Sequence, residues 1–242
     1  MGWWGEIAGL VVPAECAGCG VARVWLCEGC REALGGGSAG VVRPRPAPPG
    51  LPVVHAAAGY AGGVRAVLLA HKERGALPLA GPLGGALAAA VLAGGDGGDR
   101  AGLVLVPVPS ARRQVRARGH DPARRIALAA SARLRRAGIP ARVAPVLRQR
   151  RRVADQAGLG AGQRRANLAG ALEVRPGGAR PLAGGRLVLV DDLITTGHTL
   201  AEAARALRAS GAAPEGLRAA VVAAPAGSFD ALATRTAQGT GE

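Results

Sequence analysis

The sequence predicts an α/β fold in which a parallel sheet is flanked by helices and a small cysteine-bearing segment precedes the sheet. From residue 51 onward, short apolar runs alternate with stretches of helical spacing, a pattern typical of a parallel sheet covered on both faces. All four cysteines lie within residues 1–34. A hydrophobic share of 49% indicates a packed globule rather than a disordered chain.

The expected strands share a short length, a Val, Leu and Ala composition, and a boundary of Pro, Gly or Asp. They cover residues 52–61, 103–109, 141–147, 186–192 and 216–225. The expected helices are bounded by caps or stop signals. They cover residues 63–74 before Gly75, a buried stretch beginning near Pro82, a stretch from Pro122 with Asp121 as its cap and Gly138 as its stop, and residues 199–209.

Composition divides the chain into four parts. Residues 1–34 hold the cysteines, and residues 35–50, GGGSAGVVRPRPAPPG, form a connector that is extended where its prolines cluster. Residues 51–228 form the α/β domain, and residues 229–242 are expected to be a flexible tail.

The chain is strongly basic, with a formal charge of +15 and a single lysine, Lys72, so its basic residues are otherwise arginines. Two explanations stay open: a surface that binds anions, and codon bias in a GC-rich genome. Aromatic residues make up 2% of the chain, which argues against a nucleic-acid surface built by base stacking. Electrostatic DNA binding stays open.

Residues 76–95 are uncharged, which raises the alternative of a membrane span. Pro78, Pro82 and several glycines favour a buried helix instead, because Gly and Ala contribute little insertion energy. No basic leader precedes the apolar patch at the N-terminus. We therefore expect no membrane span and a cytoplasmic location.

The apolar run LVLV at residues 187–190 ends directly in Asp191 and Asp192, and a turn rich in hydroxyl groups follows. Ligands of open α/β sheets bind beyond the carboxyl ends of the strands. Gly197 permits a tight turn, the backbone N–H groups of the turn can surround an anion, and the next helix adds its positive N-terminus. The segment predicts a phosphate cradle beside two acceptors, as a phosphorylated sugar requires. The alternatives are a solvated acidic loop and an acidic pocket like that of response regulators.

Residues 187–200 resemble the 5-phosphoribosyl 1-diphosphate (PRPP) signature of type I phosphoribosyltransferases, an apolar strand followed by two acids, two residues and Thr-Thr/Ser-Gly-x-Thr. The resemblance implies a phosphoribosyltransferase-like fold, with Asp191 and Asp192 as the catalytic pair that holds the ribose hydroxyls. It also implies Mg²⁺ bound with PRPP, and 5-phosphate binding by Thr195, Thr196, Gly197, His198 and Thr199.

Four arginines follow the expected strand at residues 103–109. Guanidinium groups suit diphosphate, which carries several charges, and the loop after this strand binds diphosphate in PRPP-using enzymes. The resemblance therefore implies diphosphate binding by Pro109, Ser110, Arg112 and Arg113. The alternative is a solvated basic face.

The polar, glycine-containing segment at residues 148–167 has the composition of a mobile lid. A closed lid would exclude water from a reactive ribosyl centre. The residues expected to act in this lid are Arg152, Gln156, Arg164 and Asn167.

The order of these pieces resembles the ComF family, which is linked to competence and DNA uptake. They are the paired CxxC units, Tyr60, the His71-Lys72 pair, the Pro-Val-Pro run, an Arg-Gly step before a helix, the arginine-rich lid and DDxxTTGxT. Where that family has an RGFNQ-like segment, this chain has RGHDP at residues 118–122.

Cys16, Cys19, Cys27 and Cys30 form two CxxC units separated by seven residues. Four thiolates at this spacing predict a tetrahedral, structural Zn²⁺ site, and the metal would stabilise a segment too small to bury a core of its own. Disulfides and a redox CxxC are the alternatives.

We therefore expect a PRPP-binding protein that transfers a phosphoribosyl group to an unknown acceptor and releases diphosphate. Residues 52–75 would build the acceptor pocket. Two other functions stay open: a non-catalytic DNA-uptake or competence factor that binds nucleic acid or competence-machinery proteins, and an anion-binding scaffold.

Overall fold

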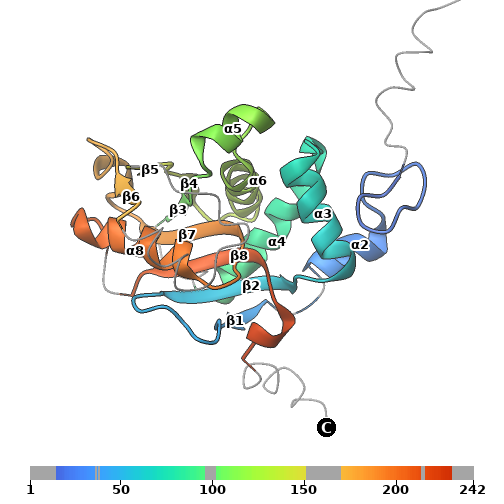
Figure 1. The fold of residues 1–242 in the computed structure, drawn as a ribbon, viewed down its shortest axis with the longest axis horizontal. Helices are drawn as coiled ribbons and strands as arrows, with labels where there is room; N and C mark the ends of the chain where they lie inside the picture. The colour runs from blue at the N-terminus through green and yellow to red at the C-terminus, as the bar shows by residue number, and fades with distance from the viewer. Residues whose placement is uncertain are drawn as a thin grey trace, which may run out of the picture.

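A six-stranded sheet in the order β1-β2-β8-β7-β3-β4 forms the centre of the molecule (Figure 1). The computed structural model describes residues 15–35, 37, 39–95, 102–150, 170–213 and 216–230. β1 runs antiparallel to β2, and the other neighbouring strands pair in parallel. The predicted α/β fold with a mostly parallel sheet is confirmed. The strands of this sheet are β1 (Gly40–Val42), β2 (Val53–Gly59), β3 (Leu103–Pro107), β4 (Ala141–Val143), β7 (Arg186–Leu193) and β8 (Arg218–Ala224).

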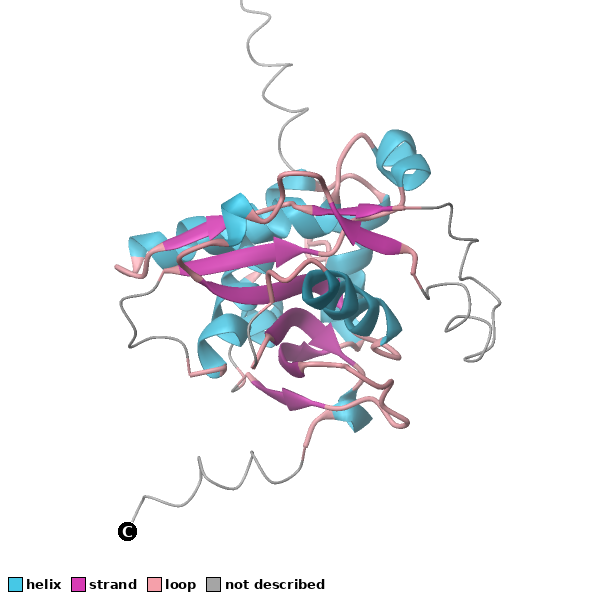
Figure 2. Cartoon of the chain, turned by 90° about the vertical axis from the view of Figure 1, so that its left-hand side faces the viewer, coloured by secondary structure: helices cyan, strands magenta, loops and turns pink. Residues whose placement is uncertain are grey.

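Helices cover the sheet on both faces, and Figure 2 shows the strands with helices packed against them. The helices are α2 (Glu28–Gly35), α3 (Gly62–Glu73), α4 (Ala80–Ala93), α5 (Arg112–Arg118), α6 (Pro122–Arg136) and α8 (His198–Ala209). Alternate strand residues point to opposite faces. Val188 and Val190 of β7 therefore join the core under α4 and α6, whereas Leu187 and Leu189 join the core under α8.

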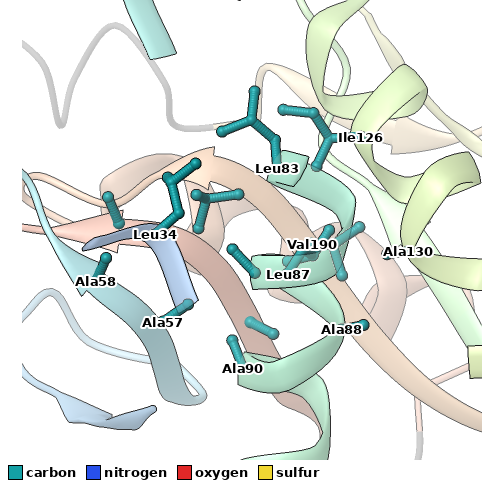
Figure 3. Close-up of a cluster of buried hydrophobic side chains, with 14 of the residues drawn as sticks. Leu34, Ala57, Ala58, Leu83, Leu87, Ala88, Ala90, Ile126, Ala130 and Val190 are labelled. Carbon is teal, nitrogen blue, oxygen red and sulfur yellow. The ribbon is translucent and has the colours of Figure 1, made fainter. Parts of the chain in front are cut away.

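The larger core is built from small side chains, as the scarcity of aromatics requires. Figure 3 shows Leu83 and Leu87 of α4 near Ile126 of α6 and Val190 of β7. α4 and α6 pack closely, because a Cβ added at Gly84 would lie 2.5 Å from Ala129 Cβ. The absence of a side chain at Gly84 allows this close contact.

One predicted strand is wrong. Residues 141–147 do not form a single strand: β4 ends at Val143, and β5 (Leu147–Gln149) begins after Pro145. Proline has no N–H to donate to a strand neighbour. β5 instead pairs antiparallel with β6 (Leu172–Val174) in a separate two-stranded sheet.

Part of the expected connector and part of the uncharged stretch form regular secondary structure. Residues 40–42, within the expected connector, are β1 at the edge of the main sheet. Residues 80–93, within the uncharged stretch, are α4, and Leu83, Leu87 and Val91 of this helix are buried. Among the described residues, no helix combines the length and the apolar character needed to cross a bilayer.

Candidate functional site

The candidate site lies where the chain leaves two neighbouring strands in opposite directions. β3 and β7 are parallel neighbours. The chain continues from β3 through α5 and α6 to β4 on one side, and from β7 through α8 to β8 on the other. α6 and α8 pack on opposite faces of the sheet. The loops after β3 and β7 therefore diverge, and ligands of open α/β sheets bind in a crevice of this kind.

Asp191 and Asp192 lie at the carboxyl end of β7, at this point of divergence. Asp192 is 6% exposed, and its backbone N–H donates to Asp191 Oδ1 over 2.8 Å. Burial and the neighbouring Asp192 carboxylate raise the pKa of Asp191 well above its ordinary value. Two adjacent carboxylates in this position require a positive partner.

Lys72 of α3 is that partner. Its Nζ donates to Asp192 Oδ2 over 2.8 Å, across 120 positions of sequence. Burial acts to lower the pKa of Lys72, but the carboxylates of Asp192 and Asp191 outweigh this effect and raise its pKa. Lys72 is therefore a cation at neutral pH and offsets part of the charge of the acid pair.

The turn after β7 ends in a left-handed glycine directly before α8. Gly197 has φ +79°, precedes α8 and supplies no side-chain cap to the helix. Because glycine has no side chain, the N-cap residue leaves the first-turn N–H groups of α8 without a side-chain acceptor. Uncapped N–H groups at a helix N-terminus attract anions. The Thr196 hydroxyl lies 3.0 Å from His198 Nδ1, while Thr195 is exposed and Thr199 is half-buried.

The loop after β3 is tied to the start of α6 by Asp121. Asp121 Oδ1 accepts from the backbone N–H of Arg124 over 3.2 Å, so the predicted cap is confirmed. The same carboxylate accepts from the backbone N–H of Ser110 over 3.4 Å. Ser110 and Pro109 are half-buried, whereas Arg112 and Arg113 are exposed in the first turn of α5. The residues predicted to bind diphosphate thus lie in the loop after β3 and in the first turn of α5. Their binding of diphosphate stays a prediction.

Segment 118–120 is attached to the last turn of α3. Arg118 forms two hydrogen bonds with the Glu73 carboxylate, 2.7 and 3.0 Å long. His120 Nε2 lies 3.2 Å from the His71 carbonyl oxygen, and its Nδ1 lies 3.1 Å from the Arg118 carbonyl oxygen. These contacts hold α3 against the end of α5 and the loop that follows it. They give structural roles to Arg118 and His120, which the sequence could not assign.

The four cysteines converge into one cluster. Their sulfurs all lie within 4.8 Å of one another, and sulfurs bound to one tetrahedral zinc lie about 3.8 Å apart, given Zn–S bonds of about 2.3 Å. The cluster is therefore compatible with a structural zinc ion. Backbone donors outweigh the opposing effect of burial and lower the pKa of Cys16 to about 6.

This cluster packs against the start of α3 and against the main core. A Cβ added at Gly63, in the first turn of α3, would lie 3.3 Å from Cys30 Sγ. Cys16, Leu26, Cys30 and Leu34 are members of the larger core cluster. The cysteine segment therefore shares the core of the α/β domain, and Figure 1 shows α2 beside α3.

Comparison with known families adds an independent finding. Residues 151–232 match the family model of the phosphoribosyl transferase domain. The match includes β6, β7, α8 and β8, and with them Asp191, Asp192 and the turn at residues 195–199. Together with the parallel sheet, it shows a phosphoribosyltransferase-like α/β fold. No curated protein matches the chain.

The match begins with the segment expected to form a lid. Arg152, Gln156, Arg164 and Asn167 lie outside the residues that the structure describes. The predicted lid therefore stays a prediction from sequence.

Proposed function

We propose that this protein binds PRPP together with Mg²⁺ and transfers the phosphoribosyl group to an acceptor, releasing diphosphate. One observation carries the proposal: the acid pair and the Gly197 turn stand together at the carboxyl end of β7, where the chain directions diverge. That arrangement offers hydroxyl acceptors and an anion cradle on adjacent residues. The phosphoribosyl transferase match over the same residues supports it.

In this proposal each segment has a separate task. Asp191 and Asp192 accept hydrogen bonds from the ribose hydroxyls, and the turn at residues 195–199 binds the 5-phosphate through backbone N–H and threonine groups. Arg112, Arg113 and the loop at Pro109 and Ser110 stabilise the negative charge that develops on diphosphate as its bond to the ribose breaks.

The site suits Mg²⁺ because its donors are oxygens, from carboxylates and hydroxyls. Among the described residues, the cysteine cluster is the one group of three or more ligand-type side chains placed to hold a metal. Mg²⁺ would thus be bound mainly by substrate oxygens and water, and it would neutralise diphosphate charge. We also propose that the four thiolates hold a structural Zn²⁺, and that residues 1–34, 35–50, 51–228 and 229–242 are the parts of a ComF-like chain.

Calorimetric titration of Mg²⁺ and PRPP tests the proposal. The wild type should bind, and an Asp191→Asn, Asp192→Asn double variant should lose binding while remaining folded, as a cooperative melting transition would show. Glu173→Gln is the matched control, because Glu173 is paired with Arg148 in the β5–β6 sheet and should bind as the wild type does. Equal binding by the double variant would contradict the assigned ribose site.

A second candidate function, a competence-related nucleic-acid factor, is favoured by the arginines of α5 and α6. Eight of them are exposed and form no ion pair with any described residue: Arg112, Arg113, Arg116, Arg124, Arg125, Arg133, Arg135 and Arg136. Electrostatic DNA binding weakens steeply as salt rises. DNA affinity with such a salt slope, together with no PRPP binding, would favour this candidate over the transferase.

A further inference from the structure

Lys72 is the one lysine in a chain whose other basic residues are arginines, and it lies at the acid pair. Its side chain is 34% exposed, whereas the Asp192 side chain is 8% exposed. The ammonium group thus reaches a nearly buried carboxylate from the more open side of the site. A lysine supplies a compact charge on a flexible stem, and a planar guanidinium is not an equivalent replacement.

The turn that carries Lys72 is held on both sides. The carbonyl oxygen of the preceding residue, His71, lies 3.2 Å from His120 Nε2, and the carboxylate of the following residue, Glu73, is bonded twice to Arg118. His71 itself is fully buried. Three consecutive residues of α3 thus contact β7, the last residue of α5 or the segment after α5, which fixes the direction of the Lys72 side chain.

We infer that Lys72 is a positioning residue for the sugar: it holds Asp192 by Oδ2, so that the other carboxylate oxygen accepts a ribose hydroxyl. The inference rests on the proposed function and assigns a new member to the same site. A carboxylate with one oxygen fixed by a cation presents the other in a defined direction. Lys72 also offsets charge, since Asp191 and Asp192 adjoin each other in a partly desolvated position.

The competing role is direct contact between Lys72 and diphosphate. The two roles differ in the ligands that they affect. If Lys72 acts through Asp192, its loss weakens the binding of every ligand that contains the ribose, including ribose 5-phosphate, which has no diphosphate. If Lys72 contacts diphosphate, its loss weakens the binding of PRPP and inorganic diphosphate and leaves the affinity for ribose 5-phosphate unchanged.

The test titrates ribose 5-phosphate, PRPP and inorganic diphosphate, each with Mg²⁺, into the wild type and a Lys72→Met variant. Met matches the length of the lysine stem without its charge. We expect ribose 5-phosphate and PRPP to bind at least about tenfold more weakly to the variant, as loss of a charged hydrogen bond implies, and diphosphate binding to be unchanged. Asp192→Asn should give the same pattern, and adding Lys72→Met to it should cause little further loss.

The outcomes separate this inference from the proposed function. Selective weakening of PRPP and diphosphate, or full additivity of the two substitutions, would overturn the positioning role and leave the transferase proposal standing. A wild type that binds neither ribose 5-phosphate nor PRPP would overturn both. Melting temperature and zinc content of each variant check that the fold is intact, and Lys72→Gln, titrated with the same three ligands, provides a second reading if Lys72→Met fails to fold.

Discussion

Replacing Gly197 by alanine should damage the phosphate turn through two separate effects. Gly197 has φ +79°, and holding an alanine in this left-handed region costs about 1–2 kcal/mol. An added Cβ would also lie 3.1 and 3.2 Å from the two methyl carbons of Leu51 and 3.4 Å from Pro44 Cγ. Moving Leu51 off its preferred rotamer adds about 0.5–1.5 kcal/mol.

Gly211 provides the matched control, because it has φ +70° and nothing lies within 4 Å of its added Cβ. Urea unfolding should therefore show a loss of about 2–3 kcal/mol for Gly197→Ala and about 1–2 kcal/mol for Gly211→Ala. Calorimetry should show PRPP affinity reduced at least about tenfold for Gly197→Ala, equivalent to about 1.4 kcal/mol, with Gly211→Ala close to the wild type. Equal losses of stability, with PRPP affinity unchanged in both variants, would refute the reasoning.

Three further predictions concern the frame around the site. Gly84→Ala should destabilise the protein by about 1–3 kcal/mol, because the added methyl group would overpack against α6. Gly85→Ala, with nothing within 4 Å of its added Cβ, should instead stabilise the protein by about 0.5–1 kcal/mol. Denaturant unfolding in which both variants changed the free energy of unfolding in the same direction would contradict the α4–α6 contact. Glu202 accepts from the Leu172 backbone N–H and from Arg205, and these contacts outweigh burial and lower its pKa, so Glu202→Gln should cost about 2–3 kcal/mol at pH 7. The extra stability of the wild type over Glu202→Gln should be complete above the pKa of glutamate in the unfolded chain, about 4.3, and should disappear as pH falls through the lower pKa of the folded state. Unfolding measured at a series of pH values tests this. A stability difference that grew on acidification would be inconsistent with this ion pair. Metal analysis should find about one zinc per chain in the wild type and much less in Cys30→Ser. Gly18→Ala should also lose zinc, because the added Cβ would lie 2.6 Å from Cys30 Sγ. A substitution of exposed Glu32 should retain the metal.

Local patterns predicted those parts of the structure that depend on neighbouring residues. The Asp121 cap, the two acids near the end of β7 and the Gly197 turn were predictable, because each depends on residues only a few positions apart. The break at Pro145 was also visible, but the apolar residues around it outweighed the missing N–H in the prediction. β5 and β6 have only three residues each, too short for a periodic pattern.

Long-range contacts could not be predicted in the same way. The contact of Lys72 with Asp192 could not be predicted from the sequence, because the two residues lie 120 positions apart. The cysteine spacing indicated metal binding, but nothing in it indicated that Cys30 would pack beside Gly63. Both contacts depend on where α3 lies in three dimensions, which is set by the packing of the whole core.

The placement of α3 has a mechanical consequence. An α-helix of 12 residues is about 18 Å long and transmits displacement as a rod, because its rise of about 1.5 Å per residue is fixed by hydrogen bonds. Its first turn rests on the cysteine cluster and its last turn delivers Lys72 to Asp192. One helix thus joins the cysteine cluster to the acid pair, so a shift of its first turn on the cysteines would also displace Lys72 relative to Asp192.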